Sequence, residues 1–153
     1  MGNASPKKPL IWALVLAALV ASCGRQDRPF CGPASLAALL RSTGRQVSYE
    51  DILKHCRHGG PTYSFEDLQL IGNEFGVKLA GYNMNLSRAK VTNARGILEL
   101  RQGHFVALVG IGNGMARVYD PQSGANAPPE DWSFARLENE WTGRVLKLEP
   151  SSP

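Results

Sequence analysis

The chain has 153 residues, of which 43% are apolar, and its formal net charge at neutral pH is +4. This length is enough for one compact core and hardly for two. The sequence argues against nucleic-acid binding, because no run of basic residues is long enough to follow a phosphate backbone. Three cysteines are too few for a disulfide-rich scaffold, and the sequence has no CxxC pair of the kind typical of structural zinc.

The first part of the chain has the features of an export signal. Lys7 and Lys8 precede the apolar residues 10–21, and small residues follow this stretch. The stretch is short for a membrane span, which needs about 20 residues. In such a signal the lysines stay on the inner side of the membrane and the domain that follows faces outward.

A cysteine directly follows the apolar stretch. The tetrad Val20-Ala21-Ser22-Cys23 resembles a bacterial lipobox, in which the cysteine is lipidated and becomes the first residue of the mature protein. Simple signal-peptide cleavage nearby and an uncleaved anchor are the alternatives. We therefore expect residues 1–23 to be a signal or membrane anchor, and residues 24–150 to form one exported, membrane-associated domain facing the periplasm or the cell exterior.

The domain begins with helices. Residues 31–41 are apolar on almost every side, which predicts a buried central helix. Ser48 is a suitable N-cap for a second helix over residues 49–56. Ser64 opens a stretch that resembles a capping box, and it predicts a third helix that ends before Gly76.

After the third helix the pattern changes to short strands. Strands are predicted over residues 77–82, 97–100, 105–111, 115–119 and 144–148, with one helical turn at 86–90 and a helix from Ser133 to about 141. The turn at 112–114 predicts a hairpin between the two strands beside it. Helices followed by mostly antiparallel strands indicate an α+β fold.

Cys31 lies where a loop becomes the first helix. Pro33 suits the first helical turn, whose backbone N–H groups have no partner within the helix. These free N–H groups and the helix dipole favour the thiolate over the thiol. A lone cysteine is more often a small buried apolar residue, so a catalytic role depends on its companions.

Two companions stand in suitable places. Thiol catalysis needs a base and a group that orients the base. His104 precedes the buried strand 105–111, and Asp120 ends the other arm of the hairpin, so both lie at the same end of the sheet. Singly, a strand-end histidine and a turn-forming aspartate are the simpler interpretations. Together with Cys31, they predict a Cys-His-Asp triad.

Three motifs of the chain resemble those of the bacteriocin-processing cysteine peptidases, which remove double-glycine leaders. Residues 30–36 (FCGPASL) resemble the nucleophile motif of that family, residues 103–110 (GHFVALVG) its histidine motif, and residues 118–121 (VYDP) its aspartate motif. The resemblance spans roughly residues 26–149 and includes the order of the triad.

This resemblance implies a papain-like fold, with N-terminal helices packed on a mainly antiparallel sheet. It implies a cysteine peptidase without a cofactor, which cleaves peptides after a Gly-Gly pair through Cys31, His104 and Asp120. The family also has an oxyanion-hole glutamine, normally six residues before the cysteine. Here Gln26 stands five residues before Cys31, and Arg25 occupies the sixth position.

The resemblance also bears on partners and on other functions. Many family members are the N-terminal domain of an ATP-driven exporter, so a membrane-embedded exporter is a candidate partner, although this sequence contains no ATP-binding motif. One alternative is an acyl or peptidyl transferase similar to phytochelatin synthase. Another is a non-catalytic domain that binds leader peptides.

A further group of residues lies in the loop after the second helix. His55, Cys56 and His58 stand close together, but their spacing fits no strong zinc pattern, and we expect a helix end without a metal. Cys56 is expected to be structural. An oxidising compartment would also allow Cys56 to pair with Cys31 and block the enzyme.

Overall fold

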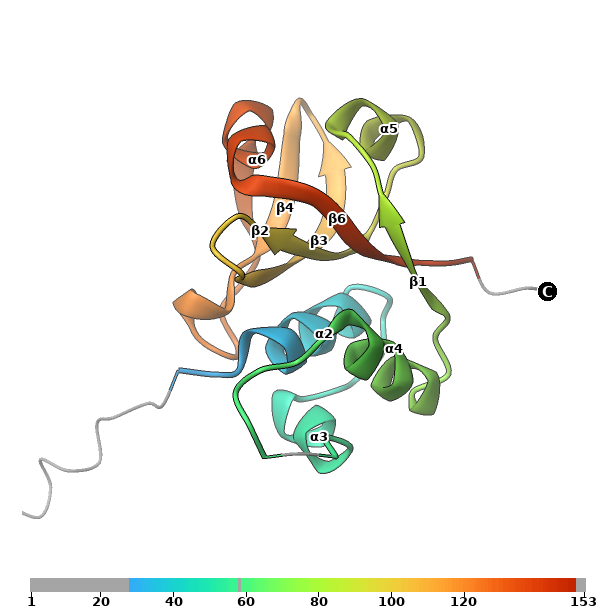
Figure 1. Ribbon diagram of the computed structural model, residues 1–153. Helices are drawn as coiled ribbons and strands as arrows, with labels where there is room; N and C mark the ends of the chain where they lie inside the picture. Colours follow the sequence, from blue (N-terminus) through green and yellow to red (C-terminus); the bar gives the residue numbers. More distant parts are fainter. Residues whose placement is uncertain (1–27, 58, 151–153) are drawn as a thin grey trace, which may run out of the picture.

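The computed structural model describes residues 28–57 and 59–150 of the protein. A twisted sheet separates one group of helices from two further helices, which gives the α+β architecture that the sequence predicts (Figure 1). In chain order the elements are α2 (Cys31–Arg41), α3 (Tyr49–Lys54), α4 (Phe65–Glu74), β1 (Leu79–Asn83), α5 (Leu86–Val91), β2 (Gly96–Leu100), β3 (Phe105–Gly112), β4 (Met115–Tyr119), the 3-10 turn η1 (Pro121–Ser123), β5 (Glu130–Ser133), α6 (Phe134–Glu140) and β6 (Trp141–Leu148).

The helix α2 forms the centre of the helical layer. Most of its side chains are buried, including Leu36, Leu39 and Leu40, which are fully buried. Burying one such side chain contributes about 1.5–3 kcal/mol. The helix packs on β3 and also contacts α3 and α4, so its N-terminal residue, Cys31, is held at a fixed place beside the sheet.

Capping boxes start the next two helices. The Ser48 hydroxyl accepts a hydrogen bond from the backbone N–H of Asp51, and the Asp51 carboxylate accepts one from the backbone N–H of Ser48. Ser64 and Asp67 make the same pair of bonds at α4. Each box satisfies two N–H groups that would otherwise lack a partner. The predicted starts of both helices are confirmed, and α3 ends at Lys54, two residues earlier than predicted.

Within residues 28–57 and 59–150, the sheet has six antiparallel strands in the order β1-β6-β2-β3-β4-β5. The last strand, β6, therefore lies between the first two. Gly96 of β2 faces β6 so closely that an added Cβ would overlap with the Leu146 carbonyl oxygen. This close approach requires a glycine at the position.

Two features of the sheet differ from the sequence prediction. Strand β5 was not predicted, and it pairs with β4 from Met115↔Ser133 to Val118↔Glu130. Strand β6 starts at Trp141, where the predicted helix was to end. Trp141 has an extended backbone and pairs with Leu100, so α6 passes into β6 without a loop.

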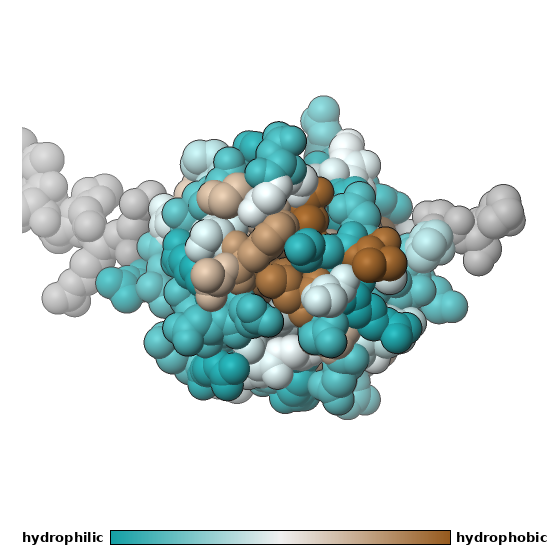
Figure 2. Space-filling model, turned by 90° about the horizontal axis from the view of Figure 1, so that it is seen from above, coloured by the Kyte–Doolittle hydropathy of each residue, from teal (hydrophilic) through white to brown (hydrophobic). Residues whose placement is uncertain are grey.

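Each face of the sheet has its own apolar core. One core lies between the sheet and α2–α4, and the other lies under α5 and α6. Seen from above, apolar side chains show between hydrophilic ones on the surface (Figure 2).

No helix within residues 28–57 and 59–150 has the length and apolar character needed to cross a membrane.

Candidate active site

Three structural elements position the predicted site residues. Cys31 is the first residue of α2, His104 directly precedes β3, and Asp120 follows β4 as the N-cap of η1. The β3–β4 ladder begins at the pair Ala107↔Tyr119, which puts His104 and Asp120 at one end of the sheet. The turn η1 contacts α2 at the same end of the molecule (Figure 1).

The imidazole of His104 lies between the other two side chains. Its Nε2 atom donates a hydrogen bond to Oδ1 of Asp120 at 2.8 Å. The imidazole also hydrogen-bonds the thiol of Cys31. The His104 and Asp120 side chains are only 15% and 14% exposed, so bulk water screens their interaction little. Because Nε2 is hydrogen-bonded to Asp120, Nδ1 is the ring nitrogen that faces the Cys31 sulfur.

The surroundings of Cys31 favour its thiolate. Burial by itself raises the pKa of this thiol, but the hydrogen bond with His104, the backbone of Phe105, the charge of His104 and the backbone of Gly32 lower it by more. The net result is a pKa below the ordinary value of 9.0. The contribution of Gly32 agrees with the position of the sulfur at a helix N-terminus.

The surroundings of His104 favour the imidazolium. Burial by itself lowers the pKa of the imidazole, whereas the hydrogen bonds with Asp120 and Cys31 and their charges raise it to about 9. Burial likewise raises the pKa of Asp120, but the bonds from His104 and from the Gln122 N–H outweigh it and leave the pKa lowered. The interactions among the three groups thus favour the thiolate, the imidazolium and the carboxylate over their uncharged or unpaired forms.

Two contacts beside the nucleophile have no counterpart in the sequence analysis. The Tyr49 hydroxyl accepts a hydrogen bond of 2.9 Å from the backbone N–H of Phe30, the residue before Cys31. The second is the backbone hydrogen bond from Phe105 to the sulfur. No sequence motif signals either contact, because one joins residues 19 positions apart and the other uses a backbone group of Phe105, which any residue would supply.

Gln26 lies outside the described residues, as do Cys23 and the apolar stretch before it. Cys31 and Cys56 are both free thiols. The Cys56 thiol donates to the Ile52 carbonyl at 3.5 Å, and burial raises its pKa, so this second thiol is the less reactive one.

The predicted helix end after α3 is held by contacts between helices. His55 contacts the carboxylate of Glu74, and its ring packs against Phe75 with the ring centroids 4.9 Å apart. Residue 58 is not among the described residues. Within the described part of the chain, no group of three or more histidine, cysteine or acidic residues could hold a metal ion.

The sequence profile of the Peptidase C39 family matches residues 22–153, which is most of the chain. The chain belongs to this family. The match extends across the segments that carry Cys31, His104 and Asp120, and it makes the protein a cysteine peptidase. No curated protein sequence matches this C39 peptidase.

Solved structures of peptidase domains share the fold. The peptidase domain of Streptococcus ComA, a bi-functional ABC transporter involved in quorum sensing, superposes with a TM-score of 0.67 at 17% identity over 83% of this chain and 96% of that one. A double-glycine motif protease from an AMS/PCAT transporter, in complex with the leader peptide, superposes with a TM-score of 0.63 at 20% identity. The match covers 82% of this chain and 89% of that one.

A third neighbour is the N-terminal C39-like domain of a toxin secretion ATP-binding protein from Vibrio parahaemolyticus. Its TM-score is 0.62 at 21% identity, and the match covers 82% of this chain and 99% of that domain. At these identities the likeness establishes the fold, and it confirms the papain-like α+β architecture.

Proposed function

We propose that this C39 peptidase cleaves peptide bonds with Cys31 as nucleophile, His104 as general base and acid, and Asp120 as the group that orients the imidazole. The observation that carries the proposal is the position of the His104 ring, which hydrogen-bonds Asp120 through Nε2 and the thiol of Cys31 on its other side. Nucleophile, base and orienting group are the three parts that thiol catalysis needs.

The reaction follows from this arrangement. His104 takes the thiol proton, and the sulfur attacks the carbonyl carbon of the scissile peptide bond. When the C–N bond breaks, the imidazolium returns a proton to the leaving amine and leaves a thioester on Cys31. Water, deprotonated by His104, then hydrolyses the thioester and frees the thiol. The Gln26 amide is proposed to donate to the oxyanion, a contact worth on the order of 3 kcal/mol in the transition state.

The proposed substrate is a peptide with a double-glycine leader, cut after the Gly-Gly pair. The three motifs around Cys31, His104 and Asp120 support this choice.

The proposed location is the periplasm or the cell exterior, with the N-terminal segment as signal or anchor. Lys7, Lys8, the apolar residues 10–21 and the lipobox-like Cys23 support this orientation. The enzyme would then act on peptides that have crossed the membrane, beside an exporter that delivers them. Mass spectrometry of the N-terminus of the mature protein tests the location, because lipidation at Cys23 and simple cleavage give different masses.

One experiment tests the proposed activity. The purified protein is incubated with a leader peptide that ends in Gly-Gly before its cargo, and with matched peptides in which either glycine is replaced by alanine. We expect a single cut after the second glycine and strong loss of cleavage in both alanine peptides. A cut elsewhere, or equal cleavage of all three peptides, would refute the Gly-Gly specificity. Faster turnover with an added amine or thiol acceptor would identify a transferase instead.

A further inference from the structure

Ser35 is buried completely, with 0% of its surface exposed, and no other serine, threonine, asparagine, glutamine, histidine or charged residue within the described ranges is buried. It lies in α2 among apolar neighbours, one turn after Cys31. A buried hydroxyl without a hydrogen bond costs folding free energy, so a serine at such a position needs a partner.

The partner of Ser35 belongs to another element. The Ser35 hydroxyl donates a hydrogen bond of 3.1 Å to the backbone carbonyl of Phe105, which is 70 residues away in sequence. A serine within a helix often donates instead to the carbonyl one turn back in its own helix. The Ser35 bond therefore ties α2 to β3. It does so one turn from Cys31 and one residue from His104.

The backbone of Phe105 has no neighbouring strand on the β4 side. The β3–β4 ladder starts at Ala107↔Tyr119, so β4 ends before it reaches Phe105. In an antiparallel sheet the N–H and C=O of one residue point to the same side. Helix α2 supplies partners for both groups, since the Phe105 backbone hydrogen-bonds the Cys31 sulfur and its carbonyl accepts from Ser35.

We propose that Ser35 is a positioning residue of the active site: its buried hydroxyl fixes the backbone of Phe105 against α2 and so sets the distance between the Cys31 sulfur and the His104 imidazole. Ser35 does not touch the substrate. Loss of its hydroxyl would leave α2 and β3 packed through apolar contacts alone, which tolerate small shifts. The Phe105 N–H, which faces the Cys31 sulfur, would then be less well aligned with it. The His104 imidazole would likewise be less well aligned with the sulfur.

The test measures how fast Cys31 of the full chain reacts with iodoacetamide at a series of pH values. Iodoacetamide labelling is resolved by peptide mass spectrometry, because the full chain also contains Cys23 and Cys56. In Ser35→Ala we expect Cys31 to be alkylated about tenfold more slowly at pH 6 and at the wild-type rate at high pH, where any thiol is ionised. On a Gly-Gly peptide, kcat falls about tenfold while KM stays within about twofold.

Control variants separate positioning from general stability. Ser42→Ala removes a hydroxyl-to-carbonyl bond of 2.6 Å at the other end of α2, and we expect it to keep the wild-type labelling profile. Ser35→Cys keeps a weak donor of similar size and should give an intermediate profile. The proposal fails if Ser35→Ala lowers the melting temperature but leaves the pH profile of Cys31 labelling unchanged, or if Ser42→Ala shifts that profile equally.

The kinetic part of this test rests on the proposed function, whereas the labelling part does not. If no Gly-Gly peptide is cleaved but labelling still shifts in Ser35→Ala, the proposed substrate is wrong and the role of Ser35 stands.

Discussion

Nε2 of His104 lies 2.8 Å from Oδ1 of Asp120, and the same oxygen accepts a hydrogen bond from the backbone N–H of Gln122 at 2.9 Å. The carboxylate is thus held by the turn that follows β4 and cannot rotate freely away from the ring. Because Asp120 engages Nε2, the ring turns its other nitrogen toward Cys31. The tautomer and the orientation of the base are therefore set by a contact on the side away from the sulfur.

The pH dependence of cleavage should reflect the thiolate–imidazolium pair. The pKa of Cys31 is lowered from 9.0, and that of His104 is raised to about 9. We expect kcat/KM to rise as Cys31 ionises, at a lower pH than an ordinary thiol would, and to fall above about pH 9, where the imidazolium loses the proton needed by the leaving amine. The measurement is kcat/KM on a Gly-Gly peptide between pH 5 and 10. A rate that keeps rising through pH 9 would show an ordinary thiol.

Asp120→Asn should lower activity and move the alkaline limb of this profile. The amide accepts a hydrogen bond but carries no charge, so the pKa of His104 should fall toward its ordinary value of 6.5. We expect kcat to drop about 100-fold or more, and the alkaline limb to shift to lower pH. Asp131→Asn, at an exposed position on β5, is the matched control and should behave as wild type. An unchanged alkaline limb in Asp120→Asn would disprove this role of Asp120.

Tyr49→Phe should destabilise the protein. The variant removes the acceptor of the Phe30 N–H, which is partly buried and directly precedes Cys31. We expect a loss of about 1–2 kcal/mol in the free energy of unfolding, measured by urea denaturation.

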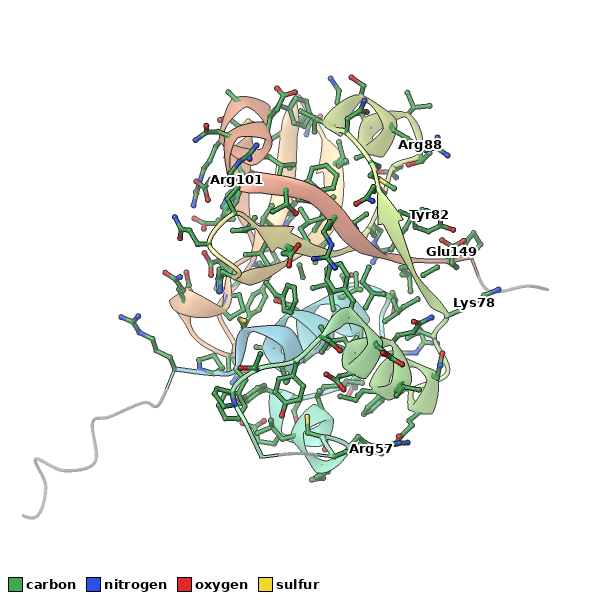
Figure 3. The ribbon with its side chains drawn as sticks, viewed as in Figure 1. Arg57, Lys78, Tyr82, Arg88, Arg101 and Glu149 are labelled. Carbon is green, nitrogen blue, oxygen red and sulfur yellow. The ribbon has the colours of Figure 1, made fainter. Side chains whose placement is uncertain are left out.

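Tyr82→Phe is the control for this loss. Tyr82 is 41% exposed on the edge strand β1, where its hydroxyl hydrogen-bonds Glu149 at the surface (Figure 3). We expect its free energy of unfolding to change by less than about 0.5 kcal/mol. Equal losses in the two tyrosine variants would show that the Phe30 contact contributes nothing specific.

Gly96→Ala should disrupt the centre of the sheet. A Cβ at this position would overlap with the Leu146 carbonyl, and a backbone oxygen cannot move aside as a side chain can. We expect a loss of about 2 kcal/mol or more in stability, measured by thermal or urea unfolding. Gly81→Ala on β1 meets no atom within 4 Å and should be close to neutral. A neutral Gly96→Ala would mean that β2 and β6 lie further apart than described.

Local signals in the sequence predicted much of this fold. The apolar run after Cys31, the capping serines Ser48 and Ser64, and the glycine turn between β3 and β4 each depend on residues close in sequence, and each appears in the structure. The hairpin also explains why His104 and Asp120 come together, because its two arms return to the same end of the sheet.

Other features depend on contacts between distant segments and carry no local signal. The insertion of β6 between β1 and β2 is fixed by pairing between segments far apart in sequence. Gly96, which has no side chain, is the one local sign of this close approach. Strand β5 is four residues long, and its sequence, EDWS, is mostly polar because it lies at the sheet edge. The Ser35 bond spans 70 positions, although a single serine within an apolar helix was visible in the sequence.

The most direct test of the triad is to trap the acyl-enzyme. The full chain is mixed with a Gly-Gly leader peptide, quenched with acid within one turnover, and examined by intact and peptide mass spectrometry. The account predicts a leader-sized thioester on Cys31, absent in Cys31→Ala, which also releases no cargo. A leader attached to another residue, or cargo released by Cys31→Ala at the wild-type rate, would contradict it.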